Sequence, residues 1–289
     1  MNVWNWSHQF IGKNKRGIYI MTPSMNTYWG ILWKMVDMAD VVVQVVDARF
    51  PSICRSNRLE DKVREMENKN LLVVLNKTDL ISREKLNQWI KWFADSEGLK
   101  AVGVSAKERL GTSRIRQEIL KLTNKDEATV AIVGFPNTGK SSLINVLKGR
   151  KSAPTAPVAG HTKTYQKVKV SRRLMMYDTP GVIPIQLPKK HQYLLGIMSL
   201  TKIKDPMGVA YDLYEQYEDL APGKIREFYN IDTVIYDFLD DLAIAKNRLQ
   251  KGGKPDKRTS ALLFLNDHLK NIIPIFENVN SPLRYKDKL

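Results

Sequence analysis

The chain carries the sequence Gly134-Phe135-Pro136-Asn137-Thr138-Gly139-Lys140-Ser141 between an apolar run, 129–133, and a helix-like segment, 142–147. This spacing predicts a strand, a phosphate loop and a helix, because glycine lets backbone N–H groups wrap a phosphate chain where a Cβ would block it. We expect Lys140 to neutralise the phosphates and the Ser141 hydroxyl to ligate Mg²⁺. A chance glycine-rich turn is the alternative, and the strand and helix around the motif disfavour it.

The composition limits the classes of protein to which the chain can belong. At 289 residues, 43% of them hydrophobic and 26% charged, the chain is typical of a soluble globular protein of one large or two ordinary domains. Its single cysteine, Cys54, excludes an internal disulfide framework and a cysteine-based metal site, so we expect a reducing compartment. No apolar run approaches the roughly 18 residues of a membrane span, so we expect a cytoplasmic protein without a membrane partner.

The formal net charge is +16, and the sequence pI is about 9.7. Such an excess of lysine and arginine favours a polyanionic partner, because it attracts phosphate backbones over several ångströms. The alternative is a basic surface that serves only solubility. The N-terminal arm, 1–25, mixes tryptophans with basic residues, which suits stacking on RNA or, equally, packing on its own domain.

Apolar runs alternate with amphipathic segments. Strands are expected at 41–46, 71–75 and 100–104, and helices at 27–39, 55–69, 82–96 and 111–122. Ser82 is the expected N-cap of the third of these helices. The alternation predicts an α/β fold with a parallel sheet and right-handed crossovers.

Two short polar motifs stand where predicted strands end. They are Asn76-Lys77-Thr78-Asp79 and Ser105-Ala106-Lys107. Ligands of such sheets lie beyond the carboxyl ends of the strands, so both motifs should share a crevice with the phosphate loop. An aspartate that accepts from guanine N1–H and the exocyclic amine distinguishes guanine from adenine, and Asp79 is placed for that role.

A further pair of motifs follows the phosphate loop. The basic loop 148–163 contains Gly160-His161-Thr162-Lys163, and strands expected at 165–170 and 174–177 lead to Asp178-Thr179-Pro180-Gly181. A loop and a D-x-x-G at a strand end are typical γ-phosphate sensors of a nucleotide switch. Since 128–177 holds no acidic residue, we expect this face to be strongly positive.

The four signatures resemble those of Ras-like P-loop GTPases, but the guanine motifs come first. This rotated order, with Asp47-Ala48-Arg49-x-Pro51 ahead of it, resembles the circularly permuted GTPases of the YlqF/RbgA type. The resemblance implies a P-loop GTPase fold with a circularly permuted, mostly parallel sheet in 1–184. It also implies a C-terminal all-α, RNA-binding domain in 185–289, with a helix over 231–242 and another over 259–270.

The resemblance further implies a GTP-hydrolysing ribosome-assembly factor. Such a protein binds ribosomal RNA and the large-subunit precursor and leaves after hydrolysis, and we expect this chain to be a monomer that does not bind DNA. Lys140, Thr162 and Gly181 would act in catalysis. Mg²⁺ would be held by Ser141, Thr162 and, through water, Asp178, and K⁺ by Asn137. The implied nucleotide-binding residues are Asn76, Lys77, Asp79, Ser105, Ala106, Lys107, Asn137, Thr138, Gly139, Lys140, Ser141, Ser142 and Gly181.

Two positions depart from the pattern. Val182 stands where Ras-like proteins place the glutamine that orients the attacking water, and Ser24 stands where some family members have a histidine. The water-positioning residue is therefore unassigned. An RNA-binding scaffold with GTP as a structural ligand is the alternative function, and a helical lid without a partner is the alternative for the C-terminal domain. Asp79 disfavours an ATP-dependent RNA enzyme.

Overall fold

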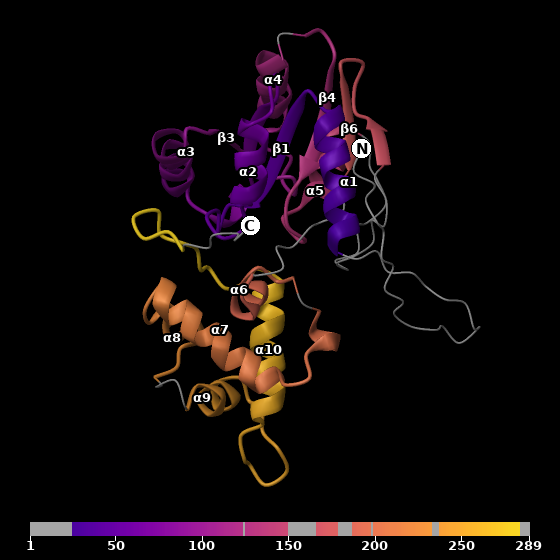
Figure 1. The fold of residues 1–289 in the computed structure, drawn as a ribbon. Helices are drawn as coiled ribbons and strands as arrows, with labels where there is room; N and C mark the ends of the chain where they lie inside the picture. Colours follow the sequence, from indigo (N-terminus) through magenta and orange to yellow (C-terminus); the bar gives the residue numbers. More distant parts are fainter. Residues whose placement is uncertain are drawn as a thin grey trace, which may run out of the picture.

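The computed structural model describes residues 25–123, 125–149, 166–178, 187–197, 199–232 and 237–283, and of residues 25–28, 166 and 178 the backbone alone (Figure 1). A six-stranded sheet has the order β3-β2-β1-β4-β6-β5. The strands are β1 (Val41–Asp47), β2 (Asn70–Asn76), β3 (Lys100–Gly103), β4 (Ala128–Val133), β5 (Gln166–Lys169) and β6 (Leu174–Asp178). Every pair is parallel except β5 with β6, so the mostly parallel α/β sheet is confirmed.

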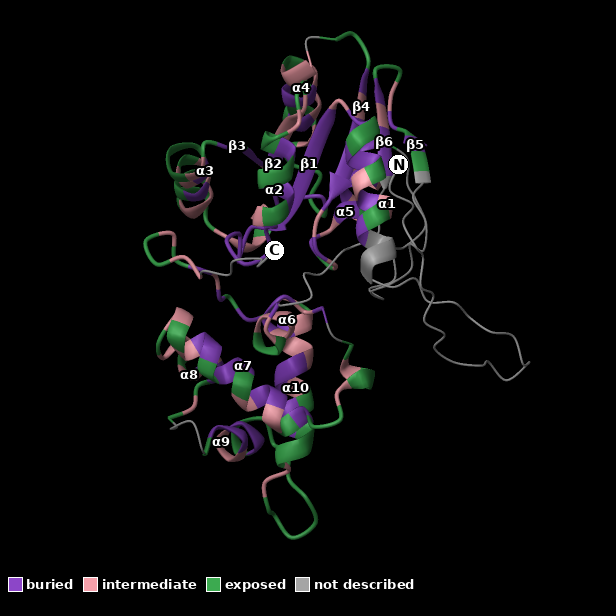
Figure 2. Ribbon diagram, viewed as in Figure 1, coloured by how far each residue is buried: buried purple, intermediate pink, exposed green. Residues whose placement is uncertain are grey.

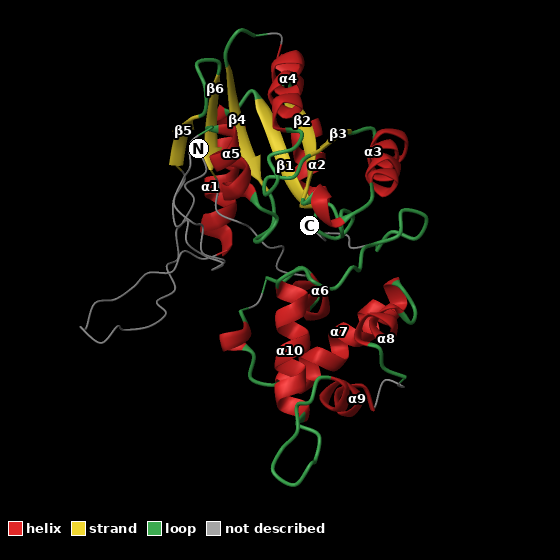
Figure 3. Ribbon diagram, turned by 180° about the vertical axis from the view of Figure 1, so that it is seen from behind, coloured by secondary structure: helices red, strands yellow, loops and turns green. Residues whose placement is uncertain are grey.

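Helices cover both faces of the sheet (Figures 1 and 3). The described helices of this part are α1 (Met25–Met38), α2 (Asn57–Arg64), α3 (Arg83–Glu97), α4 (Thr112–Thr123) and α5 (Lys140–Leu147). Alternate side chains of β1 enter different cores: Val43 and Val45 pack with α4 and α5, whereas Val42 packs with α1 and α2. This alternation explains why buried parallel strands read as continuous apolar runs.

The one polar residue in the β1 run has a specific partner. Gln44 is 1% exposed, and its Nε2 donates to Glu60 Oε1 at 2.6 Å. The Gln44 amide oxygen accepts from the Ser56 backbone N–H at 2.9 Å, and Arg55 Nε donates to Glu60 Oε1 at 2.9 Å. Buried polar groups are tolerated when they are hydrogen-bonded, so this network lets a glutamine stand inside a central strand.

The sequence predicted where most helices begin, but it did not predict where every helix ends. Ser82 caps α3 by accepting from the Lys85 N–H at 3.2 Å, as expected. The helix predicted over 55–69 is wrong in length, since α2 ends at Arg64. The start of the helix predicted over 231–242 is also wrong: α9 begins at Phe238, and Asn230, with a φ of +56°, has already ended α8.

The remaining helices lie together below the carboxyl end of the sheet (Figures 1 and 3). They are α6 (Lys189–Leu194), α7 (Pro206–Leu220), α8 (Lys224–Tyr229), α9 (Phe238–Ala245) and α10 (Lys257–Leu269), with a short 3₁₀ turn at Leu200–Lys202; another such turn, Thr78–Leu80, follows β2 in the sheet domain. Each of these helices has buried residues (Figure 2), and Tyr217 on α7 is in edge-to-face contact with Phe264 on α10. The domain boundary predicted at 184 and 185 lies outside the described residues.

The described helices include none that is both long and apolar enough to cross a membrane. After α10 the chain returns to the sheet domain. The backbone N–H of Glu277 donates to the carbonyl of Arg49 at 2.6 Å, and Lys85 Nζ lies 4.3 Å from the ring centroid of Phe276. The helical part is therefore attached to the sheet domain at its far end as well as through the segment after β6.

Candidate nucleotide site

Asn76 joins the three motifs that the sequence places at strand ends. Its side-chain nitrogen donates to the carbonyl of Thr138 in the phosphate loop at 2.8 Å. Its side-chain oxygen accepts from the backbone N–H of Ala106 at 3.1 Å. Asn76 is 2% exposed, so both bonds lie in the protein interior. The two polar motifs and the phosphate loop thus form one site at the carboxyl edge of the sheet, as predicted.

Both glycines of the phosphate loop are required by their surroundings. Gly134 has a φ of +147°, and a Cβ there would lie 2.4 Å from the carbonyl oxygen of Val45. Gly139 has a φ of +93°, and a Cβ there would lie 2.1 Å from the side-chain nitrogen of Asn76. Any other residue would displace the strand or Asn76, so glycine keeps the loop in place at the start of α5.

Lys140 lies within the loop at the first turn of α5. Its ammonium donates to the carbonyls of Gly134 and Phe135, each at 2.9 Å, and the residue is 7% exposed. The helix N-terminus adds partial positive charge at the same place. Ser141, next along the chain, is exposed, so its hydroxyl is accessible to a metal ion. A hydroxyl beside a cationic phosphate cradle fits Mg²⁺, which prefers oxygen ligands and shares them with phosphates.

The two loops that the sequence predicts to recognise the base bond to each other. Asp79 is exposed, and its Oδ1 accepts from the hydroxyl of Ser105 at 2.6 Å. Ser105 is fully buried, and its hydroxyl accepts from the N–H of Glu108 at 3.1 Å. Ser105 therefore holds one oxygen of Asp79, which fixes the plane of the carboxylate. Lys107 is exposed at the rim of the same loop.

Comparisons with known proteins agree with this geometry. A family profile described as "50S ribosome-binding GTPase" matches residues 129–232. Two structures of YlqF from T. maritima, one GDP-bound and one GNP-bound, superpose with TM-scores of 0.61 and 0.59 at 23% identity. The superpositions cover 85% and 86% of this chain, and 96% and 97% of the two YlqF chains. The chain therefore has the circularly permuted P-loop GTPase fold of YlqF.

The curated relatives are longer than this chain. An uncharacterized GTP-binding protein of Methanocaldococcus jannaschii is 35% identical over 82% of this chain and 64% of its own length. Nucleolar GTP-binding protein 2 of Cryptococcus neoformans var. grubii is 31% identical over 86% of the chain and 38% of its length. Nuclear/nucleolar GTPase 2 of Arabidopsis thaliana is 31% identical over 86% and 44%. The chain thus spans less than two thirds of the length of these relatives.

The Asp47-Ala48-Arg49 motif reaches the loop 76–79, the predicted base-recognition loop, and sequence reasoning missed this contact. Lys77 has a φ of +67°, and its Nζ donates to Asp47 Oδ2 at 2.8 Å. Arg49 donates to the same carboxylate from Nε at 3.1 Å and from Nη2 at 2.8 Å. Burial opposes ionisation, but Arg49 and Lys77 hold the pKa of Asp47 well below its usual range. The three charges form one cluster, in which Asp47 and Arg49 are buried and Lys77 is half-buried.

Asn137 joins the phosphate loop to the helical part. It has a φ of +63° and is exposed, and its side-chain nitrogen donates to the carbonyl of Gly196, which follows α6.

Asp178 ends β6 in register with Ile132 of β4, so its backbone lies beside the strand that leads into the phosphate loop. Thr162, Gly181, Val182 and Ser24 lie outside the described residues, and their predicted roles stay predictions.

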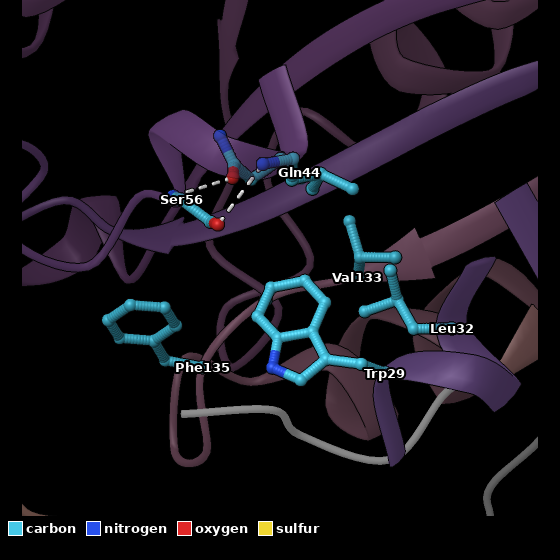
Figure 4. A pocket seen from close by; sticks show the side chains of 8 residues that line it. Trp29, Leu32, Gln44, Ser56, Val133 and Phe135 are labelled. Atoms are coloured by element: carbon cyan, nitrogen blue, oxygen red, sulfur yellow. Dashed lines mark hydrogen bonds between the residues drawn. The ribbon is translucent and has the colours of Figure 1, made fainter. Parts of the chain in front are cut away.

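A small pocket lies behind the phosphate loop, between α1 and β1 (Figure 4). Trp29 and Phe135 form two of its walls, and Trp29 stacks on Trp33 at 5.4 Å and under the guanidinium of Arg58 at 4.7 Å. The complete lining is Trp29, Leu32, Gln44, Ser56, Leu59, Val133, Gly134 and Phe135. Since none of these side chains is charged, the pocket belongs to the packing of α1 on the loop and is no phosphate site.

Proposed function

We propose that the protein binds and hydrolyses GTP, and that the cycle controls its binding to ribosomal RNA in a large-subunit precursor. The observation that carries the proposal is the convergence on Asn76, which bonds to the phosphate loop and to the Ser105-Ala106-Lys107 loop. In this site, Lys140 and the N-terminus of α5 bind the phosphates, and Asp79 selects guanine. When bound, Mg²⁺ supplies positive charge to the β- and γ-phosphates, and Ser141, Thr162 and Asp178 would hold it.

The ribosomal part of the proposal has two supports. The matching family profile is described as ribosome-binding, and several relatives are named as nucleolar. The net charge of +16 also suits a phosphate-rich partner. A cytoplasmic location, a monomeric state and the lack of DNA and membrane partners stay predictions.

One exposed basic surface is available on the helical part. The hairpin between α9 and α10 closes through the Gln250 N–H, which donates to the Lys254 carbonyl at 2.7 Å, and it projects from the end of the helical part away from the sheet (Figure 1). We call the exposed basic residues around it the hairpin cluster. They are Lys246, Arg248, Lys251, Lys254, Lys257 and Arg258. A projecting hairpin with this charge can approach a phosphate backbone without disturbing the nucleotide site.

Replacing four residues of the hairpin cluster by glutamine should weaken association with ribosomal particles and leave GTP binding unchanged. The four are Arg248, Lys251, Lys254 and Arg258. Each lost phosphate contact should make the slope of log affinity against log salt concentration shallower by roughly 0.7 to 0.9. The loss of all four contacts should therefore make the slope shallower by about 3. Co-sedimentation with ribosomal subunits, with a non-hydrolysable GTP analogue and at several salt concentrations, measures this.

A matched control replaces two lysines and two arginines on α2 and α3. These exposed residues are Lys62, Arg64, Arg83 and Lys91. The control removes the same net charge from another surface, so it should retain most of the association. Equal losses in both variants would mean that the charge acts without a defined contact, and no loss in either would contradict RNA docking at the hairpin.

Asn137 supports a role for K⁺. Its side-chain nitrogen is bonded to Gly196, which fixes the amide plane, and its side-chain oxygen is the atom that would bind the ion. Hydrolysis should be several-fold faster in KCl than in NaCl at equal ionic strength, because a cation near the phosphates supplies charge that an arginine would otherwise supply. Asn137→Ala should abolish the difference, whereas Asn145→Ala on α5 should keep it. Equal rates in the two salts would refute a bound K⁺.

Turnover separates the main proposal from the scaffold alternative. Val182 and Ser24 replace the residues that would orient the attacking water, so intrinsic hydrolysis should be slow and should rise when ribosomal particles are added. Single-turnover hydrolysis with and without particles tests this. Absence of hydrolysis in both conditions, with intact GTP binding, would favour a scaffold in which GTP is a structural ligand.

A further inference from the structure

Asp47 fixes the side chain of Lys77 from beneath the base-recognition loop. It ends β1 in register with Asn76, and it is 3% exposed. Its carboxylate accepts from the Arg49 backbone N–H at 3.0 Å as well as from the Arg49 guanidinium and the Lys77 ammonium. The forked bond from Arg49 orients the Asp47 carboxylate, and the single charge-assisted bond from Lys77 holds the Lys77 ammonium against it.

The loop that follows Asp47 is held by the far end of the chain. The Arg49 carbonyl accepts from the Glu277 N–H at 2.6 Å, and Glu277 Oε2 accepts from the Ser52 N–H at 3.0 Å. The Ser52 hydroxyl donates to the other oxygen of Glu277. Glu277 is 1% exposed, and it lies 225 positions from Ser52. The segment after α10 therefore contacts residues 49–52 directly, in the loop that follows Asp47.

Apolar side chains of the same loop belong to the core of the helical part. Phe50 and Ile53 are fully buried in one cluster with Tyr217 of α7 and Phe264 of α10. The Tyr217 hydroxyl is hydrogen-bonded to His268 Nδ1 on α10. A packed core transmits a shift of one element to its neighbours, so a displacement of α7 or α10 would move this loop.

We propose that Asp47 is a positioning residue for guanine-nucleotide binding, and that the contact of Glu277 with residues 49–52 sets how firmly it holds Lys77. The helical part is thus connected to the base-recognition end of the site by a route separate from the switch loops. Separation of the Glu277 segment from this loop would release Lys77 and speed nucleotide dissociation. The inference rests on the proposed function, since Lys77 belongs to the proposed guanine site.

The first test is the affinity for GDP of Asp47→Asn, measured with a fluorescent GDP analogue. Loss of one charged bond to Lys77 should weaken binding about tenfold. Asp40→Asn is the matched control: Asp40 precedes the other end of β1, where its Oδ1 accepts from Lys125 Nζ at 2.6 Å. The control removes a charged pair beside the same strand, yet it should bind GDP as the parent does. If Asp47→Asn does not fold, Arg49→Lys, which loses the forked geometry, is measured instead with the same expectation.

The second test separates positioning from general loosening of the structure. In a double-mutant cycle, Lys77→Met should have little further effect on GDP affinity once Asp47 is asparagine. Additive effects would mean that Asp47 has a structural role only, and would overturn the proposal.

The third test concerns the connection to the helical part. Glu277→Ala should speed GDP release about fivefold or more, whereas Glu227→Ala, which removes an exposed pair with Lys224 on α8, should not. Unchanged release in Glu277→Ala would overturn the connection. If the parent protein and Asp47→Asn both bind GDP normally, the result contradicts this inference but not the proposed function. Failure of the parent to bind guanine nucleotides would contradict the proposed function itself.

Discussion

Replacing Lys140 by alanine should weaken GTP binding by about a hundredfold or more. The ammonium lies inside the phosphate loop, 2.9 Å from two loop carbonyls, and the residue is 7% exposed. It is therefore already held where the phosphates would bind, and two charged bonds to them contribute about 1.5 to 3 kcal/mol each. Isothermal titration with GTP and Mg²⁺, with circular dichroism to establish folding, measures the loss.

Lys91→Ala provides the control for this prediction. Lys91 is an exposed lysine on α3 paired with Asp95 on the same helix, so its removal should leave GTP affinity within about twofold of the parent. Retention of parental affinity in a folded Lys140→Ala variant would contradict the assignment of residues 134–141 as the phosphate loop. Equal losses in both variants would show that the assay responds to overall charge.

The sheet was predictable because local and global signals agree there. Runs such as 41–46 and 71–75 are β-branched or apolar, too short for isolated helices, and followed by polar turns, so only buried parallel strands fit them. The Gln44 contact was not predictable, since its partner Glu60 lies on a helix that is itself charged. Neither was the start of α9 at Phe238, because the apolar periodicity begins earlier, at Ile231, while Asn230 has left the helical conformation.

The convergence of the motifs followed from their spacing, because each motif lies at the carboxyl end of a strand and such ends meet at one edge. The role of Asp47 did not follow. Its partner Lys77 comes from another strand, and the loop after it is held by Glu277, 225 positions beyond Ser52. Long-range contacts of this kind leave no periodic or spacing signal in a single sequence. The Asp-Ala-Arg motif marked the place without indicating the chemistry.

Replacing Asp79 by asparagine should change the base preference of the site from guanine toward xanthine. Asp79 is exposed, and its Oδ1 accepts from the buried hydroxyl of Ser105 at 2.6 Å, which holds the carboxylate in one orientation. A carboxylate accepts from the N1–H and amine of guanine, whereas the amide of asparagine offers a donor that suits the C2 oxo group of xanthine. A site built for one hydrogen-bond pattern strongly rejects the other, because its polar groups are then left unpaired.

GTP affinity should therefore fall by at least about a hundredfold in Asp79→Asn, while XTP affinity rises above that of the parent. Competition between labelled GDP and unlabelled XTP or GTP measures both changes in one titration. Asp95→Asn, an exposed aspartate on α3, is the control and should keep the parental preference. Ser105→Ala should lie between the two, because Asp79 keeps its charge but loses the bond that orients it. A folded Asp79→Asn variant that still prefers GTP would place the base contact elsewhere, and the Asn76-Lys77-Thr78-Asp79 loop would then be a structural neighbour of the site only.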